Sequence, residues 1–111
     1  MSLSQTFRSL PRAWIYLVAE DKTNYTKVGI SSNPPKSRAR ELGTGNPRQL
    51  ILFYSRELPS GQAALTLERA VLDWQRGLGH WTRNEWFRHK GLREEIAAWI
   101  DAQADDLRKA A

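Results

Sequence analysis

One acidic residue lies where an ionised side chain is unfavourable unless something compensates its charge. Residues 61–78 show the 3.6-residue periodicity of a helix. The inward stripe of this helix is apolar and consists of Ala64, Leu67, Val71 and Trp74, widened by Leu65 and Leu72. Glu68 lies inside the same apolar half, where an ionised carboxylate costs several kcal/mol unless it is paired, hydrated or bound to a cation. Glu68 is therefore a partner in a buried bridge to an arginine, a cleft-edge residue that reaches water, or a functional carboxylate.

Three other polar residues belong to segments that should form the core. On the helix predicted over 34–42, Arg38 is four residues before Leu42, so both side chains lie on the side of the helix directed toward the sheet. A structural arginine whose aliphatic stem covers apolar surface would have the same position. Tyr16 lies in an apolar strand, where tyrosine is either a core residue or a catalytic one. Lys27, near the start of the following strand, is uninformative alone.

These residues must be positioned by three strands and three helices. Residues 13–19 are apolar at both odd and even positions, which is typical of a strand buried on both faces of the sheet. The alternation over 27–31 fits the second, antiparallel strand of a hairpin. The remaining predicted elements are the helix over 34–42, a turn at Thr44-Gly45-Asn46-Pro47, a third buried strand over 50–54, and the helices over 61–78 and 91–109.

The length of 111 residues predicts one domain. Its predicted strands and helices together make the fold class α/β (α+β). We divide the chain into a tail over 1–12, the domain over 13–90, and a C-terminal helix over 91–111 that packs on the same domain. The absence of cysteine excludes disulfides, thiolate catalysis and cysteine-ligated zinc. No apolar run approaches the roughly 20 residues that span a bilayer. The N-terminus lacks the apolar region of a secretory signal, so we expect no membrane contact and a cytoplasmic location.

The excess of positive charge is concentrated in two segments. The chain has 17 Lys and Arg against 12 Asp and Glu, which gives a net charge of +5. Residues 22–48 and 76–93 are strongly basic, whereas the segment from residue 94 onward is acidic. This separation favours one face for a polyanion and one for solvent, although a solvated basic surface would look the same.

Taken in order, these residues resemble the GIY-YIG nuclease superfamily, and within it the branch of T5orf172 or Mug113-like domains. The resemblance covers about residues 13–88 and is most specific in KVGISSN and RELGTGNP. The matching segments are Trp14-Ile15-Tyr16, Lys27-Val28-Gly29, Asn33-Pro34, Arg38, Thr44-Gly45-Asn46-Pro47, Leu67-Glu68 and Asn84-Glu85-Trp86-Phe87. It implies a small three-stranded antiparallel sheet flanked by helices, and metal-dependent endonuclease activity on a nucleic-acid phosphodiester, with DNA as the expected substrate.

The resemblance also implies a role for each matching position. Tyr16 matches the tyrosine that orients or deprotonates the attacking water, and Lys27 takes the place of the second tyrosine and assists the nucleophile. Gly29 keeps the floor of the site free of a side chain. Arg38 matches the arginine that binds the scissile phosphate, and Glu68 matches the carboxylate that holds the metal, Mg²⁺ or Mn²⁺.

The sequence departs from the family pattern at three positions. Trp14 replaces the glycine of the first motif, Lys27 replaces a tyrosine, and Leu72 stands where the branch often has a histidine. His80 and His89 could compensate for that histidine or contact phosphate.

A nucleic-acid-binding module of the same fold without efficient cleavage is the alternative function. The residues expected to contact nucleic acid in either case are basic: Lys36, Arg40, Arg48, Arg83 and Arg88. A protein-interaction domain that uses the C-terminal helix fits less well, because the apolar stripe of that helix is needed for packing on the domain's own core. A homodimer or a partner protein would have to supply any sequence specificity.

Overall fold

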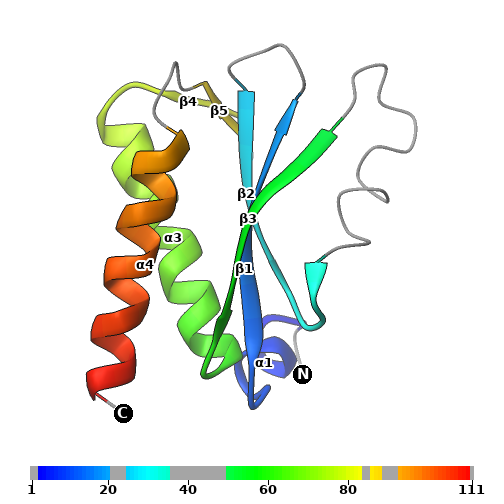
Figure 1. The fold of residues 1–111 in the computed structure, drawn as a ribbon. Helices are drawn as coiled ribbons and strands as arrows, with labels where there is room; N and C mark the ends of the chain where they lie inside the picture. The colour runs from blue at the N-terminus through cyan, green and yellow to red at the C-terminus, as the bar shows by residue number, and fades with distance from the viewer. Residues whose placement is uncertain (1–2, 21–24, 36–49, 84–85, 89–92, 111) are drawn as a thin grey trace.

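An antiparallel sheet forms the centre of the molecule (Figure 1). The computed structural model describes residues 3–20, 25–35, 50–83, 86–88 and 93–110. The central strand β1 (Ala13–Glu20) pairs antiparallel with β2 (Tyr25–Ser31) on one side and with β3 (Leu50–Leu58) on the other. The predicted three-stranded antiparallel sheet flanked by helices, with an additional C-terminal helix, is therefore confirmed.

Two short strands extend the sheet beyond β2. They are β4 (Trp81–Arg83) and β5 (Trp86–Arg88), and the strand order is β3-β1-β2-β5-β4. β5 pairs with β2 only over Tyr25–Lys27. Within the described part of the chain, the remainder of β2 has no strand partner on that side. An alternation of apolar and polar residues cannot be recognised in only three residues, so the sequence did not predict these strands.

The register assigns the residues of β1 and β2 to two faces. Tyr16 pairs with Gly29 and Val18 pairs with Lys27. Because directly paired residues share a face and neighbours along a strand alternate, Trp14, Tyr16, Val18, Lys27 and Gly29 lie on one face, here called the Tyr16 face. The other face carries Ala13, Ile15, Leu17 and Val28, all of which are fully buried.

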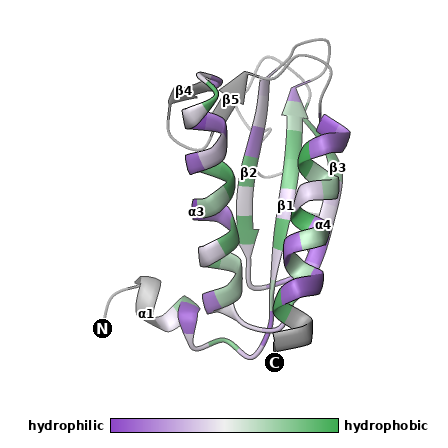
Figure 2. Ribbon diagram, turned by 90° about the vertical axis from the view of Figure 1, so that its left-hand side faces the viewer, coloured by the Kyte–Doolittle hydropathy of each residue, from purple (hydrophilic) through white to green (hydrophobic). Residues whose placement is uncertain are grey.

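Helices α3 (Gly61–Gly77) and α4 (Arg93–Ala110) cover this second face. Figure 2 shows α3 on the β2 side of β1 and α4 on the β3 side. The shared core contains Ile15, Leu17 and Val28 from the sheet, Ala64, Leu67 and Val71 from α3, and Ile96, Ile100 and Ala104 from α4. The two helices also meet through Trp74 and Trp99, whose rings stack with centroids 5.0 Å apart. The apolar stripes predicted for both helices are thus used for packing on this core.

The first twelve residues, predicted as a tail, contain a short helix, α1 (Leu3–Arg8). α1 lies against the beginning of α3. The amide of Gly61 donates a hydrogen bond to the carbonyl of Leu10 at 3.1 Å, and a Cβ atom at Gly61 would overlap the carbonyl of Phe7. Glycine at the first position of α3 therefore allows the two backbones to touch.

Other expectations from the sequence meet different outcomes. The helix predicted over 34–42 and the turn at 44–47 lie outside the described residues. The third strand is longer than predicted, and the prediction that 50–54 is buried is wrong, since Ile51 is 43% exposed. Among the described strands, β3 lies at the edge of the sheet with β1 as its single neighbour, so part of it remains accessible.

None of the described helices combines the length and the hydropathy that a membrane span requires.

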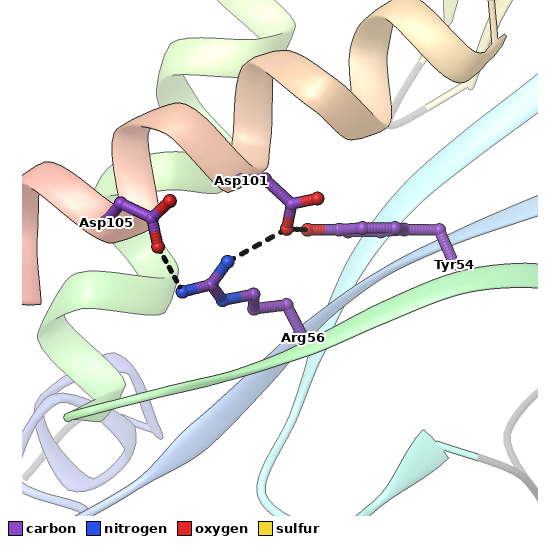
Figure 3. Close-up of polar contacts among 4 residues, drawn as sticks. All are labelled: Tyr54, Arg56, Asp101 and Asp105. Carbon is purple, nitrogen blue, oxygen red and sulfur yellow. Dashed lines mark hydrogen bonds and ion pairs between the residues drawn. The ribbon is translucent and has the colours of Figure 1, made fainter.

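A polar cluster fastens α4 to β3 (Figure 3). The Tyr54 hydroxyl donates to Asp101 at 2.7 Å, and Arg56 donates to Asp101 at 3.0 Å and to Asp105 at 2.7 Å. These hydrogen bonds raise the pKa of Arg56, and burial, followed by the hydrogen bond to Asp101, raises the pKa of Tyr54 above its ordinary value of 10.0. These four residues, here called the clasp, hold α4 against β3. The acidic segment from residue 94 onward is thus not only a solvated face.

The sign of the pH effect follows from the direction of the Tyr54 shift. A raised pKa means that the folded chain favours the protonated phenol. Its contribution to stability is therefore complete below the ordinary pKa of tyrosine and is lost as the pH rises toward the folded-state pKa. The contribution of Tyr54 to the clasp should therefore be lost in alkaline solution.

We expect Asp101→Ala to lower the free energy of unfolding by about 1–2 kcal/mol, because it removes the acceptor shared by Tyr54 and Arg56. Asp106→Ala is the matched control, since Asp106 is an exposed carboxylate of the same helix that makes no described contact with β3. Urea denaturation measures both. Equal losses in the two variants would show that the clasp adds nothing to stability.

Candidate functional site

The closest contact on the Tyr16 face joins Tyr16 and Gly29. Tyr16 is only 2% exposed, and its ring lies across the backbone of Gly29 on the neighbouring strand. A Cβ atom at Gly29 would overlap Cζ and Oη of the phenol and lie 2.8 Å from Cε2. Glycine is therefore needed here for space, and the missing side chain fixes where the Tyr16 hydroxyl lies.

Lys27 lies next to this contact on the same face. It is two residues from Gly29 along β2, a separation of roughly 7 Å, and it pairs with Val18 of β1. Its side chain is half-buried, and its backbone is the last point at which β5 pairs with β2. The hairpin thus places Tyr16, Gly29 and Lys27 on one face of two neighbouring strands.

Glu68 comes from the helical layer on the other side of the sheet. It follows the buried Leu67 and is itself half-buried. At 100° per residue it lies about 120° around α3 from Trp74, the residue that stacks on α4. Since α4 lies on the β3 side, this flank of α3 is directed toward the β2 side of the molecule (Figure 2). Tyr16 and Glu68 therefore lie on opposite faces of the sheet, and each is next to β2.

A hollow of about 590 Å³ lies on the surface of α3, and Glu68 is one of its lining residues. Its polar lining includes Arg69, Asp73 and Arg76 from α3 and Arg8 from α1. Among the described residues, no three His, Asp or Glu side chains gather into a metal-binding group. A divalent cation at Glu68 would therefore depend on water and ligand oxygens, which is how Mg²⁺ is commonly bound.

Several predicted contact residues cannot be placed relative to this site. Arg38, Lys36, Arg40 and Arg48 lie outside the described residues, as does His89. The backbones of Arg83 and Arg88 lie at the ends of β4 and β5, beyond β2.

Two basic residues of the segment 76–93 have structural roles. Arg93 donates to the hydroxyl of the buried Thr26 at 3.0 Å and to the carbonyl of Tyr25 at 3.2 Å, so it ties the beginning of α4 to β2. His80 bonds through Nδ1 to Oε1 of the buried Gln75 at 2.8 Å. The net charge of residues 76–93 is therefore larger than the positive charge that a polyanion can reach.

Sequence reasoning missed the arginines that line the hollow with Glu68. The 3.6-residue periodicity of the helix places Arg69 and Arg76 on its solvent side, and both are exposed in the structure. The only sequence signal was their spacing of seven residues, which places both on one side of a helix. Nothing in the sequence connected them with Arg8, because that contact depends on how α1 docks on α3.

Comparison with known families gives one match. The model of the T5orf172 domain matches residues 13–104, a region that begins with β1 and includes most of α4. No curated protein and no solved structure matches the chain.

Proposed function

Because the chain belongs to the T5orf172 domain family, which is part of the GIY-YIG-like nuclease group, we propose that it is a metal-dependent endonuclease that hydrolyses phosphodiester bonds of DNA. The observation that carries the proposal is the position of the Tyr16 phenol, which is held over Gly29 and next to Lys27. These are the residues that match the two tyrosine motifs of the superfamily. The family match by itself supports the coarser description, a nuclease-like or DNA-binding domain.

In the proposed reaction, a water molecule attacks phosphorus and the bond to the leaving oxygen of the sugar breaks. The Tyr16 hydroxyl positions the water, the Lys27 amine assists removal of its proton, and the leaving sugar oxygen takes up a proton from solvent. Arg38, which the resemblance assigns to the scissile phosphate, would hold two of its oxygens with the planar guanidinium group. The packing of the ring against Gly29 is compatible with this role, because a phenol held in one position needs no reorganisation during the reaction.

Glu68 is the residue proposed to hold Mg²⁺ or Mn²⁺. It fits such an ion because it is a half-buried carboxylate in a hollow that admits water and ligand oxygens. When bound, the ion supplies Lewis-acid stabilisation of the charge that develops on the phosphate. For Glu68 and Tyr16 to act on one phosphate, that phosphate would lie at the outer edge of β2 beyond Lys27, where the pairing with β5 has ended.

The second candidate is a DNA-binding module with the same fold and little or no cleavage. The observation in its favour is that arginines line the same hollow as Glu68, since phosphate contacts alone are sufficient for binding. Lysine in place of the second tyrosine and Leu72 in place of the histidine are compatible with this alternative.

The decisive experiment is to incubate the purified chain with plasmid DNA, single-stranded DNA and RNA in Mg²⁺, Mn²⁺ or EDTA. We expect cleavage of DNA with either metal and none in EDTA. If no nucleic acid is cut with any metal while DNA still binds, the endonuclease proposal is wrong and the binding module replaces it.

A further inference from the structure

The hollow lined by Glu68 continues from α3 onto α1. Its charged lining consists of Arg8 from α1 and Glu68, Arg69, Asp73 and Arg76 from α3. Three guanidinium groups thus face two carboxylates. In Figure 2, α1 lies at the foot of α3, and hydrophilic residues recur on the outer side of α3 along its length.

Two of the three arginines are directed at solvent and not at other parts of the fold. Arg8 and Arg69 are exposed, and no ion pair joins either of them to a carboxylate of the described residues. Arg76 lies 3.9 Å from Asp73, one helical turn away, in an exposed contact. The positive charge of Arg8 and Arg69 is therefore accessible to a ligand.

The helix sets the spacing of Arg69 and Arg76. Seven residues correspond to about two turns, so the two side chains leave the same side of α3 about 10 Å apart along its axis. One strand of duplex DNA advances about 3.4 Å for each nucleotide. Where the duplex axis lies parallel to α3, the separation of the two arginines therefore spans about three base-pair steps.

The junction of α1 and α3 positions Arg8. Gly61 allows the backbone of Phe7 to rest on the first turn of α3, and its amide bonds to Leu10 at 3.1 Å. Arg8 therefore lines the hollow next to Gln62, at the beginning of α3. Since α1 lies outside the matched residues 13–104, Arg8 belongs to a part of the chain that the family model does not cover.

From this arrangement we infer that Arg8, Arg69 and Arg76 form a phosphate-binding track along α3 that leads one strand of the bound DNA past Glu68. The inference rests on the proposed function, because it takes nucleic acid as the ligand. Of the two acidic residues of the hollow, Asp73 is near Arg76, and Glu68 is the proposed cation ligand when metal is present. Each arginine of the track can hold two oxygens of a phosphate.

The test measures binding separately from cleavage. Full-length parent, Arg8→Ala and Arg69→Ala are titrated in EDTA against a short labelled DNA duplex, and fluorescence anisotropy gives the affinity between about 50 and 200 mM salt. Each variant should reduce the slope of log K against log salt by about 0.9, the value for one lost phosphate contact on duplex DNA. Arg12→Ala is the matched control. Arg12 is also exposed, lies 3.8 Å from Glu57 and is outside the hollow, so its removal should leave the slope unchanged.

Each outcome decides the inference independently of catalysis. Unchanged slopes for Arg8→Ala and Arg69→Ala would overturn the track even if the parent cleaves DNA. A loss of slope that Arg12→Ala reproduces would also overturn it, because net charge alone would then explain the binding. Absence of DNA binding by the parent in EDTA would overturn the track, whereas the proposed function is decided separately by the cleavage assay with Mg²⁺ or Mn²⁺. Reduced slopes in a chain that never cleaves DNA would support the track and leave the binding module as its function.

Discussion

Glu68→Gln should abolish metal-dependent cleavage while leaving the fold intact. Glutamine preserves the volume of the half-buried side chain and one of its two acceptor oxygens, but it removes the charge that a divalent ion needs. A bound metal contributes several kcal/mol to stabilisation of the transition state, and each 1.36 kcal/mol is a factor of ten in rate. We therefore expect a loss on the order of 10³-fold in the single-turnover rate.

The matched control for this variant is Asp73→Asn. Asp73 is an exposed carboxylate of the same helix and lines the same hollow, so its substitution changes the charge equally. It should change the rate only slightly. Circular dichroism and thermal melting verify that both variants fold as the parent does. If Glu68→Gln is folded and retains cleavage near the parent's rate, Glu68 is not the metal ligand.

Gly29→Ala should reduce both activity and stability, because its Cβ atom would occupy the space of the Tyr16 ring. The ring is almost fully buried, so it cannot move away without disturbing its neighbours. Overpacking of this kind typically costs about 1–3 kcal/mol of folding free energy. Displacement of the phenol by about 1 Å would reduce the cleavage rate by roughly 10²-fold. Urea denaturation and single-turnover kinetics measure the two effects.

Two controls separate the steric cause from a general effect of glycine replacement. Gly77→Ala adds the same methyl group near the end of α3, where no atom lies within 4 Å of the new Cβ, and should not destabilise the chain. In a Tyr16→Leu background, where no ring covers residue 29, Gly29→Ala should cost little further stability. If the cost in that background equals the cost in the parent, the contact between Tyr16 and Gly29 is not the reason for the glycine.

The elements with strong periodicity could be predicted from the sequence. Strand 13–19 appears as Ala13–Glu20, and helix 61–78 appears as Gly61–Gly77. A short run of apolar residues is typical of a buried strand, and an apolar repeat of 3.6 residues is typical of a helix. The five-stranded extent of the sheet could not be predicted, because β4 and β5 contain three residues each and form by pairing with a neighbour rather than by local preference.

Polar residues were harder to interpret than apolar ones. The charge of Arg93 was counted with a surface for a polyanion, yet Arg93 is bonded to Thr26 and Tyr25. Asp101 was counted with a solvated face, yet it binds Tyr54 and Arg56. A charged residue has the same sequence signature in both situations, because its role depends on which distant residue the fold places opposite it.

The sequence by itself determined the hairpin and hence the grouping of Tyr16, Gly29 and Lys27. These residues are close along the chain, and the antiparallel register of two adjacent strands fixes which of them share a face. The tertiary structure alone decided that α3 covers the opposite face and that Glu68 lies on its β2 flank with Arg8 nearby. Those positions arise from packing between segments about 60 residues apart, for which side-chain periodicity specifies that a face is buried but not which segment covers it.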